Sequence, residues 1–360
     1  MTNRAARVDE SLEVLLETYR GELTGYCYRM LGSYFEAEDA VQDTLIRAWR
    51  SFDGFAGRAA LRSWLYRIAT NVCLTMLGSA QRRARPMDLG PPGTADAAPG
   101  DPRPDHTWVG PVPDARVAVD TRDPAEAAVA RESIRLAFVA ALQHLPPRQR
   151  AVLILRDVLA WSAAEVAEML GTSVASVNSA LQRARATMAD ADTGGDALRP
   201  LDAQQARLLD RYVRAFEAYD MDALAALLHE DVTLNMPPLP LWLRGRAELR
   251  AWMLGTGGGC RGSRLVPTVA NGMPAFGQYR PTGPWSLMVL DISEGLIRGI
   301  TTFLDVARLF PVFDLPWQLD GSAVHPRPVA LAARQPGRPA EVDCGAGHRR
   351  SPAPTVPMSS

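Results

Sequence analysis

The feature that most constrains the fold is a pair of short helices joined by a glycine, at residues 162–189. Ser162-Ala163-Ala164-Glu165 has the capping-box pattern that begins a helix, and Gly171 follows the last apolar residue of that helix. Thr172 or Ser173 then caps a second helix. Its apolar positions repeat at helical spacing and predict a buried face: Val177, Leu181, Ala184 and Met188.

The opposite face of this second helix is small, polar and basic. The candidate DNA-contacting residues are Ser179, Gln182 and Arg183 on this face, Ser176 and Asn178 on its flanks, and Arg185. Small side chains let a helix enter a DNA major groove, and Gln182 and Arg183 are long enough to reach base edges or phosphates. A helical hairpin with a solvated outer face would look partly similar. The combination of short helix, glycine turn and capped second helix favours DNA binding.

Composition excludes several kinds of site. The 360 residues include no lysine, so all 39 basic residues are arginines, which rules out Schiff-base and phosphate-loop lysines. The four cysteines and five histidines show no metal-ligand spacing, so we expect neither a metal nor another cofactor. The polar first ten residues lack a signal-peptide core and no apolar run is long enough to cross a bilayer, which predicts a cytoplasmic protein.

The chain divides into blocks of different composition. Helical periodicity marks residues 11–85 and again 123–190, where a helix is expected from Asp123 to the proline pair Pro146-Pro147. Residues 86–122 are rich in Pro, Gly and Asp and read as a flexible acidic linker. A glycine-containing break at Thr193–Asp196 precedes a further domain at 201–320, and the tail 321–360 is expected to be disordered.

Two widely separated motifs resemble extracytoplasmic-function (ECF) RNA polymerase sigma factors. Residues 144–153, 164–167 and 176–185 resemble the family's region 4, and residues 37–45 and 61–71 resemble its region 2, in the right order. More closely, the chain is similar to the SigG-like and SigJ-like members, which carry an added C-terminal domain. The resemblance implies a non-enzymatic protein whose partners are core RNA polymerase and promoter DNA, without a membrane partner.

The resemblance also assigns roles to residues in the first block. An acidic helix with Asp39, Gln42, Asp43 and Arg47 would bind the clamp of polymerase. An aromatic loop and the basic helix after it would recognise and melt the -10 element, since aromatic rings beside arginines suit unpaired bases. The residues concerned are Phe52, Phe55, Arg58, Arg62, Trp64, Arg67, Asn71, Arg82 and Arg83. Trp64 suits a core position equally well.

In the family, the linker runs through polymerase toward its active centre, and Trp108–Asp114 resembles a short anchor within it. The C-terminal block begins with helices at about 208–219 and 222–228. Strands are expected at 232–236, 265–270, 287–292 and 297–304. Helices followed by a curved sheet resemble the cone-shaped SnoaL-like and nuclear transport factor fold. The fold class predicted is therefore multidomain, with two all-α domains and one α+β domain.

The cone-shaped fold encloses a pocket, for which His229, Asp231, Trp285 and Asp305 are the candidate lining residues. No acid–base pair stands at a telling spacing, which favours a regulatory role over catalysis. Two other functions remain open from the residues alone. A one-component repressor or activator would use the same DNA-binding helices with a ligand pocket, and a SnoaL-like enzyme would carry the helices as appendages.

Overall fold

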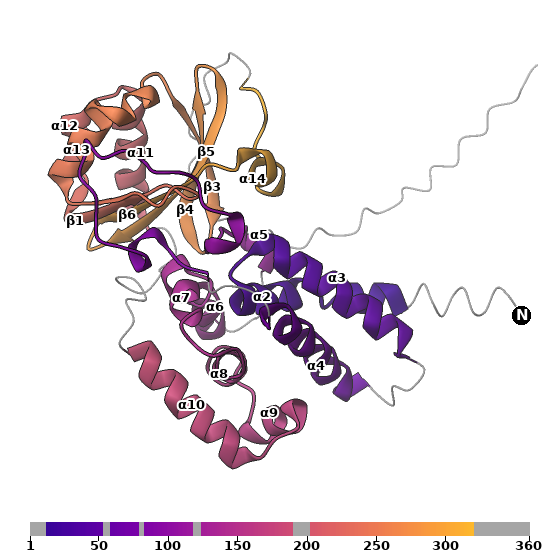
Figure 1. Cartoon of the computed structure of the whole chain (residues 1–360). Helices are drawn as coiled ribbons and strands as arrows, with labels where there is room; N and C mark the ends of the chain where they lie inside the picture. The colour runs from indigo at the N-terminus through magenta and orange to yellow at the C-terminus, as the bar shows by residue number, and fades with distance from the viewer. Residues whose placement is uncertain (1–11, 53–57, 79–82, 118–123, 190–201, 320–360) are drawn as a thin grey trace, which may run out of the picture. The chain divides into compact units, whose positions relative to one another are not determined.

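A computed structural model describes residues 12–52, 58–78, 83–117, 124–189 and 202–319. The expectations for the first ten residues, Phe55, Arg82, the break at 193–196 and the tail lie outside these residues. Arg58 begins a helix, but its side chain is also outside the described part. The described polypeptide forms helical segments in its first half and an α+β domain after residue 202 (Figure 1).

The first helical domain contains α2 (Arg20–Leu31), α3 (Tyr34–Arg50) and α4 (Arg58–Leu77). Gly32 ends α2 in the left-handed region at φ 72°, which is accessible to glycine without a steric penalty. Ser33 then caps α3 by accepting a hydrogen bond of 3.4 Å from the amide of Glu36. The three helices bury one shared core, which includes Leu23, Val41 and Leu65.

The second helical domain contains α6 (Pro124–Glu132), α7 (Leu136–Leu142), α8 (Pro147–Leu153), α9 (Ala163–Leu170) and α10 (Val174–Ala189). A π-helical turn, Ile154–Val158, follows α8. The single helix expected up to Pro146 is wrong, because Arg135 is extended (ψ 136°) and separates α6 from α7. The capping box of Ser162 and Glu165 and the left-handed Gly171 are confirmed.

The C-terminal domain begins with α11 (Ala203–Glu217) and α12 (Met221–Ala225). Its sheet contains β1 (Leu228–Asn235), β2 (Trp242–Arg244), β3 (Arg264–Ala270), β4 (Met273–Arg280), β5 (Gly283–Ser293) and β6 (Leu296–Phe303). The strand order is β2-β1-β6-β5-β4-β3, with β1 parallel to β6 and every other pair antiparallel. Two further helices are α13 (Arg246–Leu254) and α14 (Val306–Val312).

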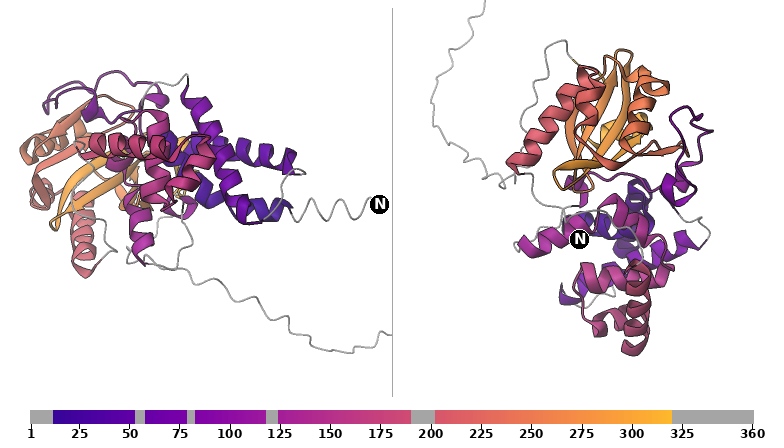
Figure 2. Two further views of the ribbon diagram at one scale, coloured as in Figure 1. Left: turned by 90° about the horizontal axis from the view of Figure 1, so that it is seen from below. Right: turned by 90° about the vertical axis from the view of Figure 1, so that its left-hand side faces the viewer.

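One face of this sheet is covered by α11, α12 and α13 (Figures 1 and 2). Leu209, Phe216 and Trp252 of these helices pack against Phe276, Leu290 and other strand residues that point to that face. The alternation of side chains along each strand leaves the second face with a separate set of residues, among them Met273 and Val289. The helix–sheet arrangement predicted from the sequence is confirmed, whereas β2, β4, α13 and α14 were not predicted.

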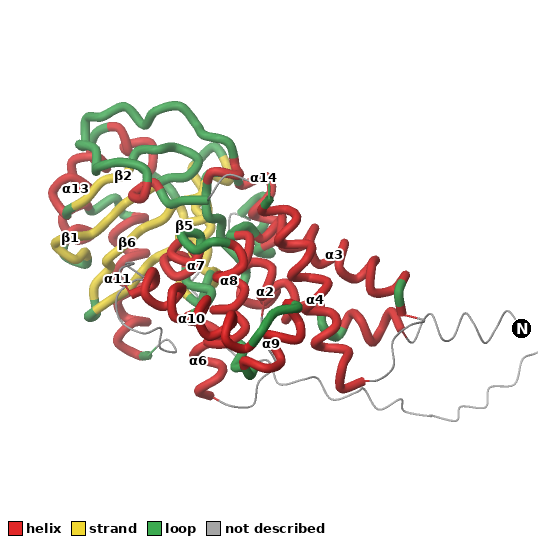
Figure 3. The backbone as a smooth tube through the Cα atoms, turned by 60° about the horizontal axis from the view of Figure 1, so that its bottom comes forward, coloured by secondary structure: helices red, strands yellow, loops and turns green. Residues whose placement is uncertain are grey.

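The segment expected to be a flexible linker instead runs alongside the C-terminal domain and bonds to it (Figures 1 and 3). The indole nitrogen of Trp242 donates to the carbonyl of Gly90 at 2.9 Å, and the amide of Gly93 donates to the carbonyl of Trp242 at 2.8 Å. The amide of Arg103 donates to the carbonyl of Pro238 at 2.9 Å. The described part of this segment forms three short helices, at Pro86–Asp88, Asp105–Thr107 and Asp114–Val117 (α5), and the backbone between them is free to bond to a neighbouring domain.

Candidate nucleic-acid interface

Helix α10 carries the side chains that were predicted from the sequence to contact DNA. Ser176, Asn178, Ser179, Gln182, Arg183 and Arg185 are all exposed, while Val177, Leu181 and Ala184 are buried. Arg183 donates a hydrogen bond of 2.6 Å to the hydroxyl of Ser179, and Arg185 forms an ion pair of 2.7 Å with Asp157. These exposed contacts cost little to exchange for DNA phosphates, so the face is available to a major groove.

The exposed face of α4 forms a second candidate surface. Arg67 and Asn71 are exposed and stand one helical turn apart, on the same side as Trp64. Trp64 is half-buried, and its ring centroid lies 6.4 Å from that of Phe52. The pair of aromatic rings beside Arg67 has the composition that stacking on unpaired bases requires.

Two arginines assigned to this surface from the sequence are engaged elsewhere. Arg62 forms an ion pair of 3.1 Å with Glu22, and its guanidinium carbon lies 5.6 Å from the ring centroid of Trp161, next to α9. Arg83 is buried and pairs with Glu36, and it also donates to the carbonyl of Trp108 at 2.8 Å. Arg83 therefore anchors the segment after α4, and the structure does not present it to DNA.

The third surface lies on α3. Asp39 and Gln42 are exposed, and Asp43 forms an ion pair of 2.7 Å with Arg47. Two large apolar side chains on the same helix, Ile46 and Trp49, are 40% and 48% exposed and were not predicted as contact residues. Both fall outside the buried positions of α3, and this mismatch with the helical period was the signal that could have revealed them.

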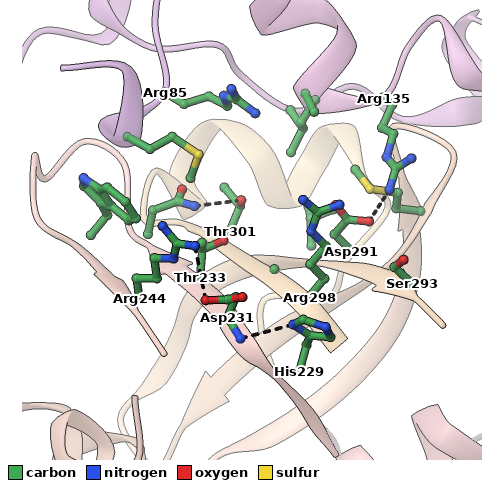
Figure 4. A pocket seen from close by; sticks show the side chains of 18 of the residues that line it. Arg85, Arg135, His229, Asp231, Thr233, Arg244, Asp291, Ser293, Arg298 and Thr301 are labelled. Atoms are coloured by element: carbon green, nitrogen blue, oxygen red, sulfur yellow. Dashed lines mark hydrogen bonds and ion pairs between the residues drawn. The ribbon is translucent and has the colours of Figure 1, made fainter. Parts of the chain in front are cut away.

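The structure separates the four candidate pocket residues into three cavities. His229 and Asp231 line a cavity of about 590 Å³ on the second face of the sheet, where the amide of Asp231 donates to His229 and Arg244 pairs with Asp231 (Figure 4). Trp285 lines a cavity of about 290 Å³ under α11 and α13. Asp305 caps α14 and borders a third cavity. The four therefore do not form one site.

The polar cavity is bordered by more than the C-terminal domain. Arg135, at the start of α7, pairs with Asp291 of β5, and Arg85 and the linker residue Asp88 also line the cavity (Figure 4). Arg135 is 1% exposed, so this ion pair is largely shielded from water on the arginine side. Breaking such a pair by removing one partner is costly, because the other charge stays buried.

The linker and the C-terminal domain meet at the turn between β3 and β4. Asn271 occupies this turn with its backbone in the left-handed region, at φ 57°. Its side-chain Nδ2 donates a hydrogen bond of 2.6 Å to the carbonyl of Ile134. Its side-chain oxygen accepts from the amide of Val112 at 3.0 Å. Nearby, the amide of Gly272 donates to Asp114, and burial raises the pKa of that carboxyl group to about 6.

Trp108 and Val112, within the segment predicted to enter polymerase, are both buried in this junction. Val109 is held by its amide, which donates to the carbonyl of Ala84 at 3.1 Å. In this conformation the segment Trp108–Asp114 therefore belongs to the protein core. Among the described residues, no helix is long and apolar enough to cross a membrane, and no group of His, Cys, Asp and Glu side chains is placed to hold a metal.

Comparison with known proteins matches each domain to a family model. Residues 15–83 match Sigma-70 region 2, residues 135–188 match Sigma-70 region 4, and residues 209–299 match the SnoaL-like domain. The crystal structure of the ECF sigma factor SigJ of Mycobacterium tuberculosis superposes with a TM-score of 0.55 at 24% identity. The superposition covers 84% of this chain and 98% of that one, and it supports the fold.

Two curated relatives align with most of this chain. The ECF RNA polymerase sigma factor SigG of Mycobacterium tuberculosis is 45% identical over 314 residues, which cover 83% of this chain and 82% of that protein. SigJ of the same organism is 31% identical over 300 residues, with 78% and 88% covered. With both sigma regions in place and this degree of identity along most of its length, the chain belongs to the ECF RNA polymerase sigma factors.

Proposed function

We propose that this sigma factor binds core RNA polymerase through α3 and recognises promoter DNA through α4 and α10, acting in the cytoplasm. The exposed carboxylates and apolar side chains of α3 suit a protein partner, with Asp39, Gln42, Asp43 and Arg47 as the polar contacts and Trp49 as the apolar one. The exposed residues of α4 and α10 suit the -10 and -35 elements. Polymerase carries out the chemistry, and the sigma factor supplies promoter selection.

We further propose that the C-terminal domain regulates initiation by holding the helical domains closed. The observation that carries this proposal is the position of Trp161, whose ring centroid lies 5.0 Å from that of Tyr66 in α4. Arg62 of the same helix lies beside both rings. Trp161 thus packs against Arg62, one of the arginines assigned to the -10 element, and freeing Arg62 for promoter DNA would require the second helical domain to leave α4.

The C-terminal domain stabilises this closed arrangement through contacts with all three preceding segments. Asn271 bonds to Tyr28 of α2, to Val112 of the linker and to Ile134 between α6 and α7. Arg135 adds the ion pair with Asp291. Because Val112, within the segment Trp108–Asp114, is buried and bonded to Asn271, opening would release this part of the segment to enter polymerase at the same time.

The proposal is tested by promoter-dependent transcription with purified core polymerase, from a library of promoter fragments, using the full chain and the chain ending at residue 200. Binding of core polymerase is measured in parallel. We expect specific transcripts from the full chain and a changed yield on truncation. Because truncation exposes the buried segment, Asn271→Ala in the full chain provides the milder variant. Absence of polymerase binding by both forms would favour a one-component DNA-binding regulator instead.

A further inference from the structure

The cavity of about 290 Å³ lies inside the C-terminal domain, between the covered face of the sheet and helices α11 and α13. Its wall is mainly apolar and aromatic, with Phe216, Leu249, Trp252 and Ile300 among the lining residues. A concave apolar space with a few polar groups is the usual form of a small-molecule site. The polar groups therefore indicate which molecule would fit.

Arg280 is the charged side chain among the described residues that line this cavity. Its guanidinium carbon lies 3.2 Å from the ring centroid of Trp285, and one terminal nitrogen lies 3.8 Å from the sulfur of Cys260. Within the described part of the chain, no carboxylate lies within ion-pair distance of it, and its buried Nε has no hydrogen-bond acceptor. A half-buried arginine without an anionic partner attracts an anion.

Tyr212 supplies a second polar group. Its side chain is 1% exposed, and its hydroxyl contacts the thioether sulfur of Met288 at 3.0 Å. A thioether is a weak acceptor, so this buried hydroxyl could donate a stronger hydrogen bond to an oxygen atom of a bound molecule. Gln278 differs, because it bonds to Ser263 at 3.1 Å and to Ser286 at 2.8 Å.

The loop Thr256–Cys260 closes one side of the cavity and depends on its glycines. A Cβ atom on Gly257 would lie 2.9 Å from the indole of Trp252, and one on Gly259 would lie 3.2 Å from Arg280. The absence of side chains lets the loop lie directly over these two residues. Pro99 of the linker also lines the cavity, so an occupant would contact the linker.

We propose that this cavity binds a small apolar carboxylic acid, with its carboxylate on Arg280 and its hydrocarbon part among the aromatic and aliphatic side chains. A carboxylate makes bidentate hydrogen bonds to a guanidinium group, which explains why the cavity carries an arginine over an aromatic ring. At ~30 Å³ for each water-sized group, the volume holds roughly ten such groups, the size of a medium-chain fatty acid.

The same lining argues against turnover of the occupant. The described lining residues include no aspartate, glutamate, histidine or lysine that could act as a general base. Burial raises the pKa of Tyr212, so its hydroxyl stays protonated and serves as a donor. Binding at this site stands independently of whether the C-terminal domain regulates initiation.

Isothermal titration calorimetry on the full chain tests the proposal with a panel of carboxylates, from butanoate to dodecanoate together with 1-naphthoate. Octanol and octylamine serve as uncharged and cationic analogues. We expect saturable binding of the medium-length carboxylates and at least tenfold weaker binding of the analogues. Arg280→Gln should weaken carboxylate binding at least tenfold, and Arg280→Lys should retain part of it. Arg261→Gln is the matched control, because Arg261 stacks on Tyr219 from the same loop and does not line the cavity.

A second measurement keeps the test independent of folding defects. In a Cys344→Ser background, alkylation of Cys260 is followed with and without octanoate, since Cys27 and Cys73 are buried. Protection by octanoate is expected in the otherwise unaltered chain and not after Arg280→Gln. The proposal is overturned if no carboxylate of the panel binds saturably, or if octanol or the Arg280→Gln variant matches the affinity of octanoate for the native cavity.

Discussion

The side-chain amide of Asn271, in the turn between β3 and β4, donates a hydrogen bond of 2.6 Å to the phenolic oxygen of Tyr28 in α2. The two residues are 243 positions apart, and both are completely buried. Tyr28 in turn donates to the carbonyl of Gly110 at 2.8 Å. A short polar chain therefore ties the C-terminal domain to the first helical domain through the linker.

Replacing Asn271 should weaken this junction. Asn271→Ala removes bonds to Tyr28, Val112 and Ile134 and leaves their polar atoms buried, and alanine tolerates the left-handed backbone poorly. We expect a loss of about 2–4 kcal/mol in the free energy of unfolding, measured by urea denaturation. Asn271→Gly keeps the backbone conformation accessible. An unchanged midpoint in both variants would show that the junction contributes nothing to stability.

The sequence was sufficient to predict the local structure around the DNA-binding helices. Ser162 with Glu165, Gly171, and the apolar period of α10 act within a few residues of one another, so the pattern determines the fold there. Strands β5 and β6 could be anticipated for the same reason, because each contains a short run of aliphatic and β-branched residues.

Long-range contacts could not be predicted in this way. The linker is rich in Pro and Gly, which indicates a lack of regular structure, yet its backbone bonds to Trp242 and Pro238 of a distant domain. Arg83 stood in a basic run and resembled a DNA contact, but Glu36 lies within reach only after the helices pack. Strand β4 contains Pro274 and Gly277, two residue types that are rare in strands, so the sequence did not predict it. Its pairing with β3 and β5 stabilises the strand despite these residues.

Substitutions of Arg83 and Arg67 should have different effects, the first on stability and the second on DNA binding. Arg83→Gln leaves Glu36 without its ion pair and removes support from the carbonyl of Trp108, so we expect a loss of about 1–3 kcal/mol in stability. Arg67 is exposed, and Arg67→Gln should leave stability unchanged while weakening binding of single-stranded -10 DNA. Thermal unfolding and fluorescence anisotropy measure the two effects. If Arg83→Gln instead weakened DNA binding and left stability unchanged, Arg83 would be a DNA-contacting residue.

The exposed indole on α3 should matter to polymerase binding. Trp49→Ala removes a large apolar contact from a surface that also carries Asp43, so the dissociation constant for core polymerase should rise at least tenfold. Trp317 is 52% exposed and lies outside α3, so Trp317→Ala is the matched control. Surface plasmon resonance with immobilised core enzyme compares the variants. If Trp49→Ala and Trp317→Ala bound core polymerase with equal affinity, Trp49 would not be part of the interface.

The residues of α10 should divide into base and phosphate contacts. Gln182→Ala is expected to cost about 1–3 kcal/mol on the preferred -35 sequence and much less on others, because a base contact is lost. Arg183→Ala should weaken all sequences similarly and lower the salt dependence by about one counterion. Arg211→Ala, an exposed arginine of α11, is the control. Equal effects of Gln182→Ala on all sequences would contradict base recognition.

Asp114 should make the junction sensitive to pH. Burial raises the pKa of its carboxyl group from 3.8 to about 6, against a hydrogen bond from Gly272 that lowers it. The folded state therefore holds the proton more tightly than the unfolded chain, and the stability that this provides is present below pH ~4 and lost as the pH rises through ~6.

Asp114→Asn keeps an acceptor for Gly272 and cannot ionise, so at pH 7.5 it should be more stable, by at most about 3 kcal/mol. Its stability should also vary less than that of the unaltered chain between pH 4.5 and 7, measured by urea denaturation at each pH. Parallel pH profiles for the two proteins would mean that Asp114 ionises in the junction without cost.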